Sequence, residues 1–166
     1  MTQRVDLATV MDHFAIDAVI TGYARAVDDA NWHEYRALFT PDGRADYRGA
    51  GGIEGSAAEV ADWLAETMKL FPVRQHLIVN RLLHRQDLGG YPGDRAELEA
   101  DYLNPMFLEN GAPPHEQNGR LPPAPNFVTG GRYAFSLIRT DSDWRLRGVV
   151  VHEKWRRTAG WETEKG

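Results

Sequence analysis

The stretch Tyr23-Ala24-Arg25-Ala26-Val27-Asp28-Asp29-Ala30-Asn31-Trp32 decides the fold, because one helix ends in it and another begins. Apolar side chains recur at helical spacing from about residue 6 to residue 28, which predicts a long amphipathic helix. Asn31 stands where an N-cap is needed for a short second helix that reaches about residue 39. Asp28 would then face the negative end of the first helix dipole. That mismatch favours a functional role for Asp28, while a pair with Arg25 or a cap for the next helix are the alternatives.

Downstream of this junction the periodicity changes from helical to alternating. Thr40-Pro41-Asp42-Gly43 has the composition of a turn, and a strand is expected over Ala45–Tyr47. Ser56, with Glu59 three residues later, predicts a capping box at the start of a third helix that ends before Pro72. Four antiparallel strands then follow by alternation: Gln75–Gln86, Asp94–Leu108, Phe127–Arg139 and Trp144–Trp155. This order predicts an α+β domain with helices packed on one face of a curved, mainly antiparallel sheet.

Length and composition indicate a single globular domain over residues 1–166. The hydrophobic fraction is 42%, and the net charge of −5 comes without a basic block, so nucleic-acid binding is not expected. Without cysteines there is neither a disulfide framework nor a thiolate metal site. The N-terminal residues lack the apolar run of a signal peptide, and no segment is apolar enough to span a bilayer, so we expect a cytoplasmic protein without membrane contact. Residues 109–126 are expected to form a mobile loop, and the tail after residue 157 is expected to fray.

The predicted strand Gln75–Gln86 carries the leading catalytic candidate. Alternation places His76 and Asn80 on one face of this strand, and both faces are largely apolar, which predicts a central strand. An imidazole held by a carboxylate is the usual general base near neutral pH, so His76 and Asp28 together are a candidate dyad. A core histidine satisfied by one hydrogen bond is the alternative. Asn80 is a candidate to polarise a substrate oxygen, or else to bind loop backbone.

Other polar and aromatic residues are candidates for the pocket wall. Tyr47 and Tyr23 could hydrogen-bond a substrate oxygen, although Tyr23 also fits core packing. Tyr133 and Trp63 are expected to supply aromatic lining. On the last strand, alternation puts His152 on the face of Trp144, Leu146 and Val150, so we expect it to face the helices as a pocket wall or rim residue. The opposite face, with Val149, Val151 and Trp155, is expected to turn outward and to form a homodimer or homotrimer.

Several chemistries have no motif here. No two histidines stand at ligand spacing, so neither a metal site nor another cofactor is expected. No dinucleotide-binding glycine pattern opens a helix, and no nucleophile elbow is present.

The chain resembles the SnoaL-like branch of the NTF2-like superfamily. The matching fragments are Tyr23–Asp28, Asn31-Trp32, Leu38–Gly43, Asp46-Tyr47, Gln75-His76 with Asn80, and Asp143–Leu146. The resemblance implies a cone in which three N-terminal helices pack on the concave face of the sheet and enclose a pocket. At the acid and the histidine the chain is similar to hexachlorocyclohexane dehydrochlorinase and to scytalone dehydratase, which implies catalytic roles for Asp28 and His76.

The chain departs from scytalone dehydratase at the residues that polarise the substrate. Val27 replaces the tyrosine before the helix acid, and the strand over Leu103–Phe107 has no second histidine. Gly131 and Tyr133 replace a serine and an asparagine. The first hypothesis is therefore a cofactor-independent lyase or isomerase (a dehydratase, cyclase or dehydrohalogenase) that acts on a small, mostly apolar cyclic molecule. The second is a non-catalytic binding protein or accessory subunit of the same fold.

Overall fold

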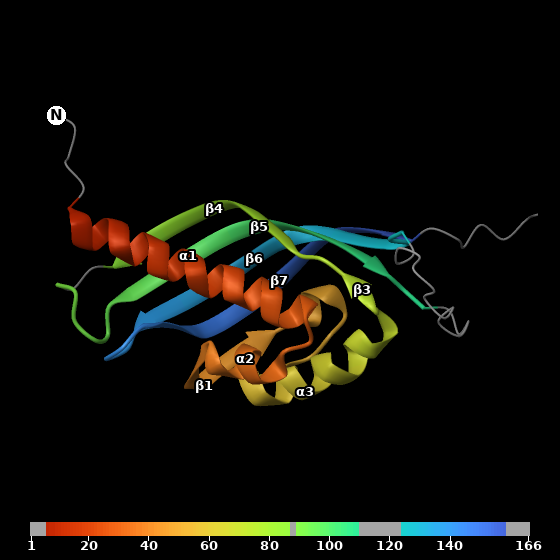
Figure 1. Cartoon of the computed structure of the whole chain (residues 1–166), viewed down its shortest axis with the longest axis horizontal. Coiled ribbons are helices and arrows are strands. Elements are labelled where there is room, and N and C mark those ends of the chain that lie inside the picture. The colour runs from red at the N-terminus through yellow and green to blue at the C-terminus, as the bar shows by residue number, and fades with distance from the viewer. Residues whose placement is uncertain (1–5, 87–88, 110–123, 159–166) are drawn as a thin grey trace, which may run out of the picture.

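A long helix, α1 (Leu7–Asp28), lies across one face of a curved seven-stranded sheet (Figure 1). The computed structural model describes residues 6–86, 89–109 and 124–158. Asp6 caps α1 by accepting a hydrogen bond from the backbone N–H of Thr9. At the other end the chain turns through Ala30, whose φ of 54° is left-handed, and the N–H of Asn31 donates to the carbonyl of Ala26. This closing turn ends α1 directly after Asp28 and leads into the next helix at once.

Two further helices and two short 3₁₀ turns complete the helical part of the described residues. Asn31 caps α2 (Trp32–Ala37), and the predicted Ser56–Glu59 capping box starts α3 (Ala57–Thr67). The 3₁₀ turns are η1 (Arg48–Ala50) and η2 (Met68–Leu70). In Figure 1, α2 and α3 lie beside β1 (Phe39–Asp46) and below the C-terminal end of α1.

The sheet has the order β2-β1-β7-β6-β5-β3, with β4 also paired to β5. Neighbouring strands run antiparallel except β1 and β7, which are parallel. The strands are β1 (Phe39–Asp46), β2 (Glu54–Ser56), β3 (Val73–Arg74), β4 (Leu77–Gln86), β5 (Arg95–Phe107), β6 (Phe127–Arg139) and β7 (Trp144–Thr158). The α+β architecture predicted from the sequence is confirmed, with α1 over the concave face.

Two predictions about strands were wrong. The segment 40–43 belongs to β1, because an irregularity between Phe39 and Arg44 absorbs its turn-like composition while both ends pair with β7. The predicted strand 75–86 begins at Leu77 and, among the described strands, pairs with β5 alone. Its outward apolar side chains, Leu77, Val79 and Leu82, remain 42–53% exposed, so the apolar composition of both faces does not reflect burial on both faces.

Strand β7 contains two bulges, so its side chains do not alternate regularly between the two faces of the sheet. Leu137 pairs with Leu146 while Ser136 pairs with Gly148, so Arg147 is an extra residue. Gly131 pairs with Glu153 while Gly130 pairs with Trp155, so Lys154 is a second one. After the first bulge the inward face is that of Val149 and Val151, which are 1% and 2% exposed and not part of the outer surface.

The N-terminal half of α1 is fastened to the sheet by a charged cluster around Asp12. Its carboxylate accepts hydrogen bonds from Arg85, from Arg139 at 2.6 Å and from the indole of Trp144 at 3.1 Å. Arg139 also contacts Asp94, just before β5, at 3.2 Å. Burial acts to raise the pKa of Asp12, but the hydrogen bonds from Arg139 and Trp144 outweigh it and hold that pKa below its usual value. The cluster therefore ties α1 to β4, β6 and β7 through one carboxylate.

The predicted mobile loop and the predicted frayed tail lie largely outside the residues that the structure describes. Residues 110–123 of the predicted loop lie outside the described residues, and so do residues 159–166 of the tail. The part of the tail that is described continues β7 to Thr158. None of the helices within the described ranges combines the length and apolar character needed to cross a membrane.

Candidate active site

The end of α1 meets the break between β3 and β4 at Asp28 and His76. One carboxylate oxygen of Asp28, Oδ1, lies 2.6 Å from Nδ1 of His76. The other oxygen, Oδ2, accepts the backbone N–H of His76 at 2.7 Å. Because the carboxylate accepts at Nδ1, the neutral ring carries its proton there and leaves the lone pair on Nε2. The His76 side chain is 6% exposed and lines a cavity of about 270 Å³.

Arg74 holds the Asp28 end of the helix in place. Its Nε donates to the carbonyl of Val27 at 2.8 Å, and its NH1 donates to the carbonyls of Phe71 and Met68 at 2.7 and 3.3 Å. Burial lowers the pKa of Arg74, and the nearby charge of Asp28 acts in the opposite direction. The guanidinium thus supplies positive charge where the helix dipole would otherwise disfavour an acid.

Asn104 on β5 contacts the other nitrogen of the His76 ring. Its Nδ2 lies 3.0 Å from Nε2 of His76, and the residue is 6% exposed. Its Oδ1 is buried and has no hydrogen-bond partner among the described residues. A buried, unsatisfied amide oxygen is uncommon, and here it belongs to a residue of the pocket wall.

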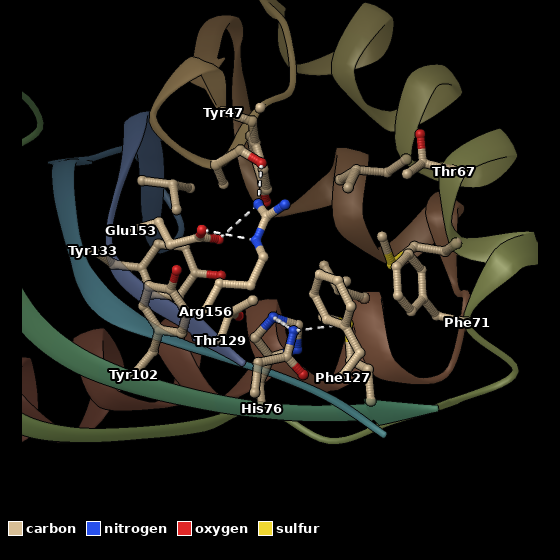
Figure 2. A pocket seen from close by; sticks show the side chains of 18 of the residues that line it. Tyr47, Thr67, Phe71, His76, Tyr102, Phe127, Thr129, Tyr133, Glu153 and Arg156 are labelled. Atoms are coloured by element: carbon tan, nitrogen blue, oxygen red, sulfur yellow. Dashed lines mark hydrogen bonds and ion pairs between the residues drawn. The ribbon is translucent and has the colours of Figure 1, made fainter. Parts of the chain in front are cut away.

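The rest of the cavity is mainly apolar and aromatic (Figure 2). Tyr47, Trp63 and Tyr133, three of the residues proposed from the sequence, line it. Phe71 and Phe127 stack edge to face with ring centroids 5.2 Å apart at one side. Other lining residues are Val27, Leu64, Met68, Tyr102, Met106 and Val151. Such a wall suits a small, mostly apolar molecule.

The tyrosines around the cavity remain protonated. Burial raises the pKa values of Tyr23, Tyr47 and Tyr133 well above the usual value for tyrosine, and it raises the pKa of Tyr102 to about 12. Tyr23 is fully buried and hydrogen-bonds the hydroxyl of Tyr47, so it stands behind the cavity wall and not in it. Near neutral pH these hydroxyls can donate or accept hydrogen bonds, but they cannot serve as tyrosinate bases.

Two predicted site residues point away from the cavity. Asn80 lies on the convex face, where it donates to Asp101 at 3.1 Å, because the β4–β5 register shifts between Val79 and Leu82. Asn80 itself has a left-handed φ of 50°. His152 is exposed opposite Arg132, because the bulge at Arg147 reverses the alternation on which its prediction rested. Neither residue shares a face with His76.

The site also contains an ion pair that sequence reasoning missed. Glu153 and Arg156 both line the cavity, although three residues apart on a regular strand they would face opposite sides. The bulge at Lys154 brings them to the same face. Arg156 donates from Nε and NH2 to the two carboxylate oxygens of Glu153, at 2.9 and 3.1 Å. Arg74 and Asn104 were missed as well, and only the strand alternation of Tyr102, Asn104 and Met106 could have placed Asn104 inside.

Comparison with known proteins identifies the family. The chain matches the SnoaL-like domain over residues 8–150. It belongs to this family. An uncharacterized protein of Mycobacterium tuberculosis is 31% identical to this SnoaL-like chain over 142 residues, which are 86% of this chain and 85% of that protein. An uncharacterized protein of Mycobacterium bovis matches to the same extent.

Solved structures share the fold of this SnoaL-like chain at low sequence identity. A hexachlorocyclohexane dehydrochlorinase from Novosphingobium barchaimii has a TM-score of 0.72 at 14% identity and covers 95% of this chain and 96% of its own. A putative scytalone dehydratase from Novosphingobium aromaticivorans has a TM-score of 0.64 at 14% identity, with coverage of 92% and 91%. A protein from Kribbella flavida has a TM-score of 0.70 at 20% identity, with coverage of 89% and 94%. The NTF2-like fold inferred from the sequence is thereby confirmed.

Proposed function

We propose that this SnoaL-like protein is a cofactor-independent lyase or isomerase that acts on a small, mostly apolar cyclic substrate. The observation that carries the proposal is the pairing of Asp28 with Nδ1 of His76, which leaves the lone pair of Nε2 on the side of an aromatic cavity. The dehydratase and dehydrochlorinase among its structural relatives agree with this kind of chemistry.

The proposed step is a proton transfer to His76. Nε2 takes a proton from a carbon of the substrate, and Asp28 stabilises the imidazolium that forms. The C–H electron pair becomes a double bond. In a dehydration the neighbouring C–O bond breaks, and the departing hydroxyl takes the proton back from His76 and leaves as water. The neutral Tyr47 hydroxyl is a candidate donor to a substrate oxygen on which charge develops.

Asn104 favours a second candidate function. Its Nδ2 lies 3.0 Å from Nε2 of His76, so this amide already engages the lone pair of the base. A non-catalytic binding protein would keep its histidine in this satisfied state. As an enzyme, the protein requires the substrate to displace this amide.

Water loss from cyclic β-hydroxyketones, followed by absorbance of the conjugated product, tests the proposal. We expect turnover by the wild type and a loss of about 10²–10⁴-fold in His76→Gln, because the base is removed. Asp28→Asn should also be impaired, since an amide can neither stabilise imidazolium as a carboxylate does nor enforce the same tautomer.

The matched control is His84→Gln, which alters an exposed histidine on the convex side of β4 and should leave the rate unchanged. If wild type and His76→Gln bind the compounds equally and neither turns them over nor exchanges their carbon-bound protons with deuterium oxide, the binding function replaces the enzymatic one.

A further inference from the structure

The Glu153–Arg156 pair is built so that one end of the guanidinium stays available to a ligand. Nε and NH2 are engaged by Glu153, and NH2 also reaches the carbonyl of Ala50 at 3.2 Å. The guanidinium carbon stands 5.2 Å from the ring centroid of Phe127. NH1 makes no hydrogen bond within the described part of the chain. Figure 2 shows this guanidinium projecting into the pocket between Tyr47 and His76.

The chemistry of the pair restricts what NH1 can bind. A guanidinium only donates hydrogen bonds, so the ligand atom must be an acceptor. The carboxylate of Glu153, 14% exposed, neutralises the charge of Arg156 and would repel a second carboxylate brought beside it. A neutral oxygen meets no such repulsion and receives a charge-assisted hydrogen bond.

We infer that Glu153 and Arg156 form a specificity subsite for a neutral carbonyl oxygen of the ligand, and that Glu153 excludes ligands with a carboxylate at this position. The family match ends at residue 150, so the pair lies outside the segment by which the chain was assigned to its family. The subsite deepens the proposed function and rests on it in one respect. With the carbonyl held by Arg156, the proton within reach of His76 would be one on the adjacent carbon, and charge on the enolate oxygen would develop at NH1.

Calorimetric titration of three compounds with the same ring skeleton tests the subsite without requiring turnover. The probes are 1-tetralone, which has a carbonyl, tetralin, which has no oxygen, and 1,2,3,4-tetrahydro-1-naphthoate, which has a carboxylate. We expect the wild type to bind the ketone about tenfold or more tightly than tetralin, as a hydrogen bond to a charged donor implies, and to bind the carboxylate more weakly than the ketone.

Substitutions separate the two roles. Arg156→Met should abolish the preference for the ketone while its affinity for tetralin reports an intact cavity. Glu153→Gln leaves Arg156 uncompensated, so the affinity for the carboxylate should rise above that of the wild type. Arg157→Met is the matched control, because Arg157 neighbours Arg156 but is exposed on the opposite side of β7, where it pairs in register with Val128.

Equal affinity of the wild type for 1-tetralone and tetralin, or no measurable binding of 1-tetralone, overturns the subsite. An unchanged affinity for the carboxylate in Glu153→Gln overturns the exclusion role of Glu153. Deuterium incorporation next to the carbonyl of 1-tetralone in deuterium oxide, compared between wild type and His76→Gln, reports separately on the proposed base. Selective ketone binding without His76-dependent exchange would therefore leave the subsite standing and remove the enzymatic function.

Discussion

At the scale of single residues, Asn104 carries both a donor and an acceptor beside Nε2 of His76. Its Nδ2 donates to Nε2 of the neutral ring, while Oδ1 is left without a partner among the described residues. If His76 becomes protonated, Nε2 turns into a donor, and the amide must rotate so that Oδ1 accepts from it. The same side chain can thus serve both states of the base.

Asn104→Asp should shift the pH dependence of the reaction. A carboxylate beside Nε2 stabilises the imidazolium, so a higher pH is needed to obtain the neutral base. We expect the acidic limb of the pH–rate profile to move up by about one pH unit or more. Asn80→Asp, the same substitution on the convex face, is the control and should leave the profile in place. Identical limbs in wild type and Asn104→Asp would contradict the assigned contact.

At the scale of elements, the C-terminal turn of α1 carries a small and removable strain. Ala30 adopts a φ of 54°, which costs a residue with a Cβ more than it costs glycine. Ala30→Gly should therefore raise the free energy of unfolding by about 0.5 kcal/mol, after the greater freedom of glycine in the unfolded chain is deducted. Urea denaturation of wild type and Ala30→Gly would measure this change in the free energy of unfolding.

The control for Ala30→Gly is the same substitution inside the helix. Ala24→Gly should lower the free energy of unfolding by about 1 kcal/mol, because glycine is a poor helix former. Destabilisation by both substitutions would contradict the left-handed conformation of residue 30.

The Asp12 cluster should make the attachment of α1 sensitive to acid. The pKa of Asp12 is lowered in the folded protein, so its contribution to stability is complete above the unfolded value of 3.8 and is lost as the pH falls through the folded value below it. Asp12→Asn should lower the free energy of unfolding by about 2 kcal/mol at pH 7, and the difference from wild type should shrink below about pH 4.

Urea titrations of both proteins at pH 7, 4 and 3 would measure this difference. Asp62→Asn, which alters a largely exposed acid, is the control and should have little effect at any of these pH values. A constant difference between wild type and Asp12→Asn across the three pH values would contradict the cluster.

At the scale of the whole molecule, the convex face of the sheet carries an apolar row. Leu77 pairs in register with Leu103, and Trp155 lies over Gly130 on the neighbouring strands. These three side chains are 38–48% exposed. We propose that this row, and not the buried Val149 and Val151, contributes to a homodimer or homotrimer.

Light scattering after gel filtration would test the association. Leu103→Glu should reduce the mass of the wild-type oligomer toward that of one chain, whereas Phe14→Glu, at an exposed apolar residue of α1, should not. A wild type that already elutes as one chain at micromolar concentration would refute the proposal.

The sequence was informative where structure is set by local patterns. The ends of α1, the Asn31 cap and the Ser56 capping box depend on neighbouring residues, and all were predicted. The contact of Asp28 with His76 was predicted through family resemblance. The sequence could not predict that Glu153 and Arg156 line the pocket, or which way His152 points. Each of these placements depends on a bulge in β7, and a bulge is defined only by the pairing of β7 with β6. Arg74 and Asn104 act on atoms supplied by distant elements, which no local pattern encodes.

The backbone N–H of His76 has a consequence for solution measurements. It is donated to a side chain on another element, the carboxylate of Asp28, and not to a neighbouring strand. Its exchange with deuterium therefore requires α1 and the β3–β4 break to separate, independently of fraying in the sheet. The protection factor of this single amide, read by nuclear magnetic resonance, measures how much of the time the histidine is held in its working position before any substrate arrives.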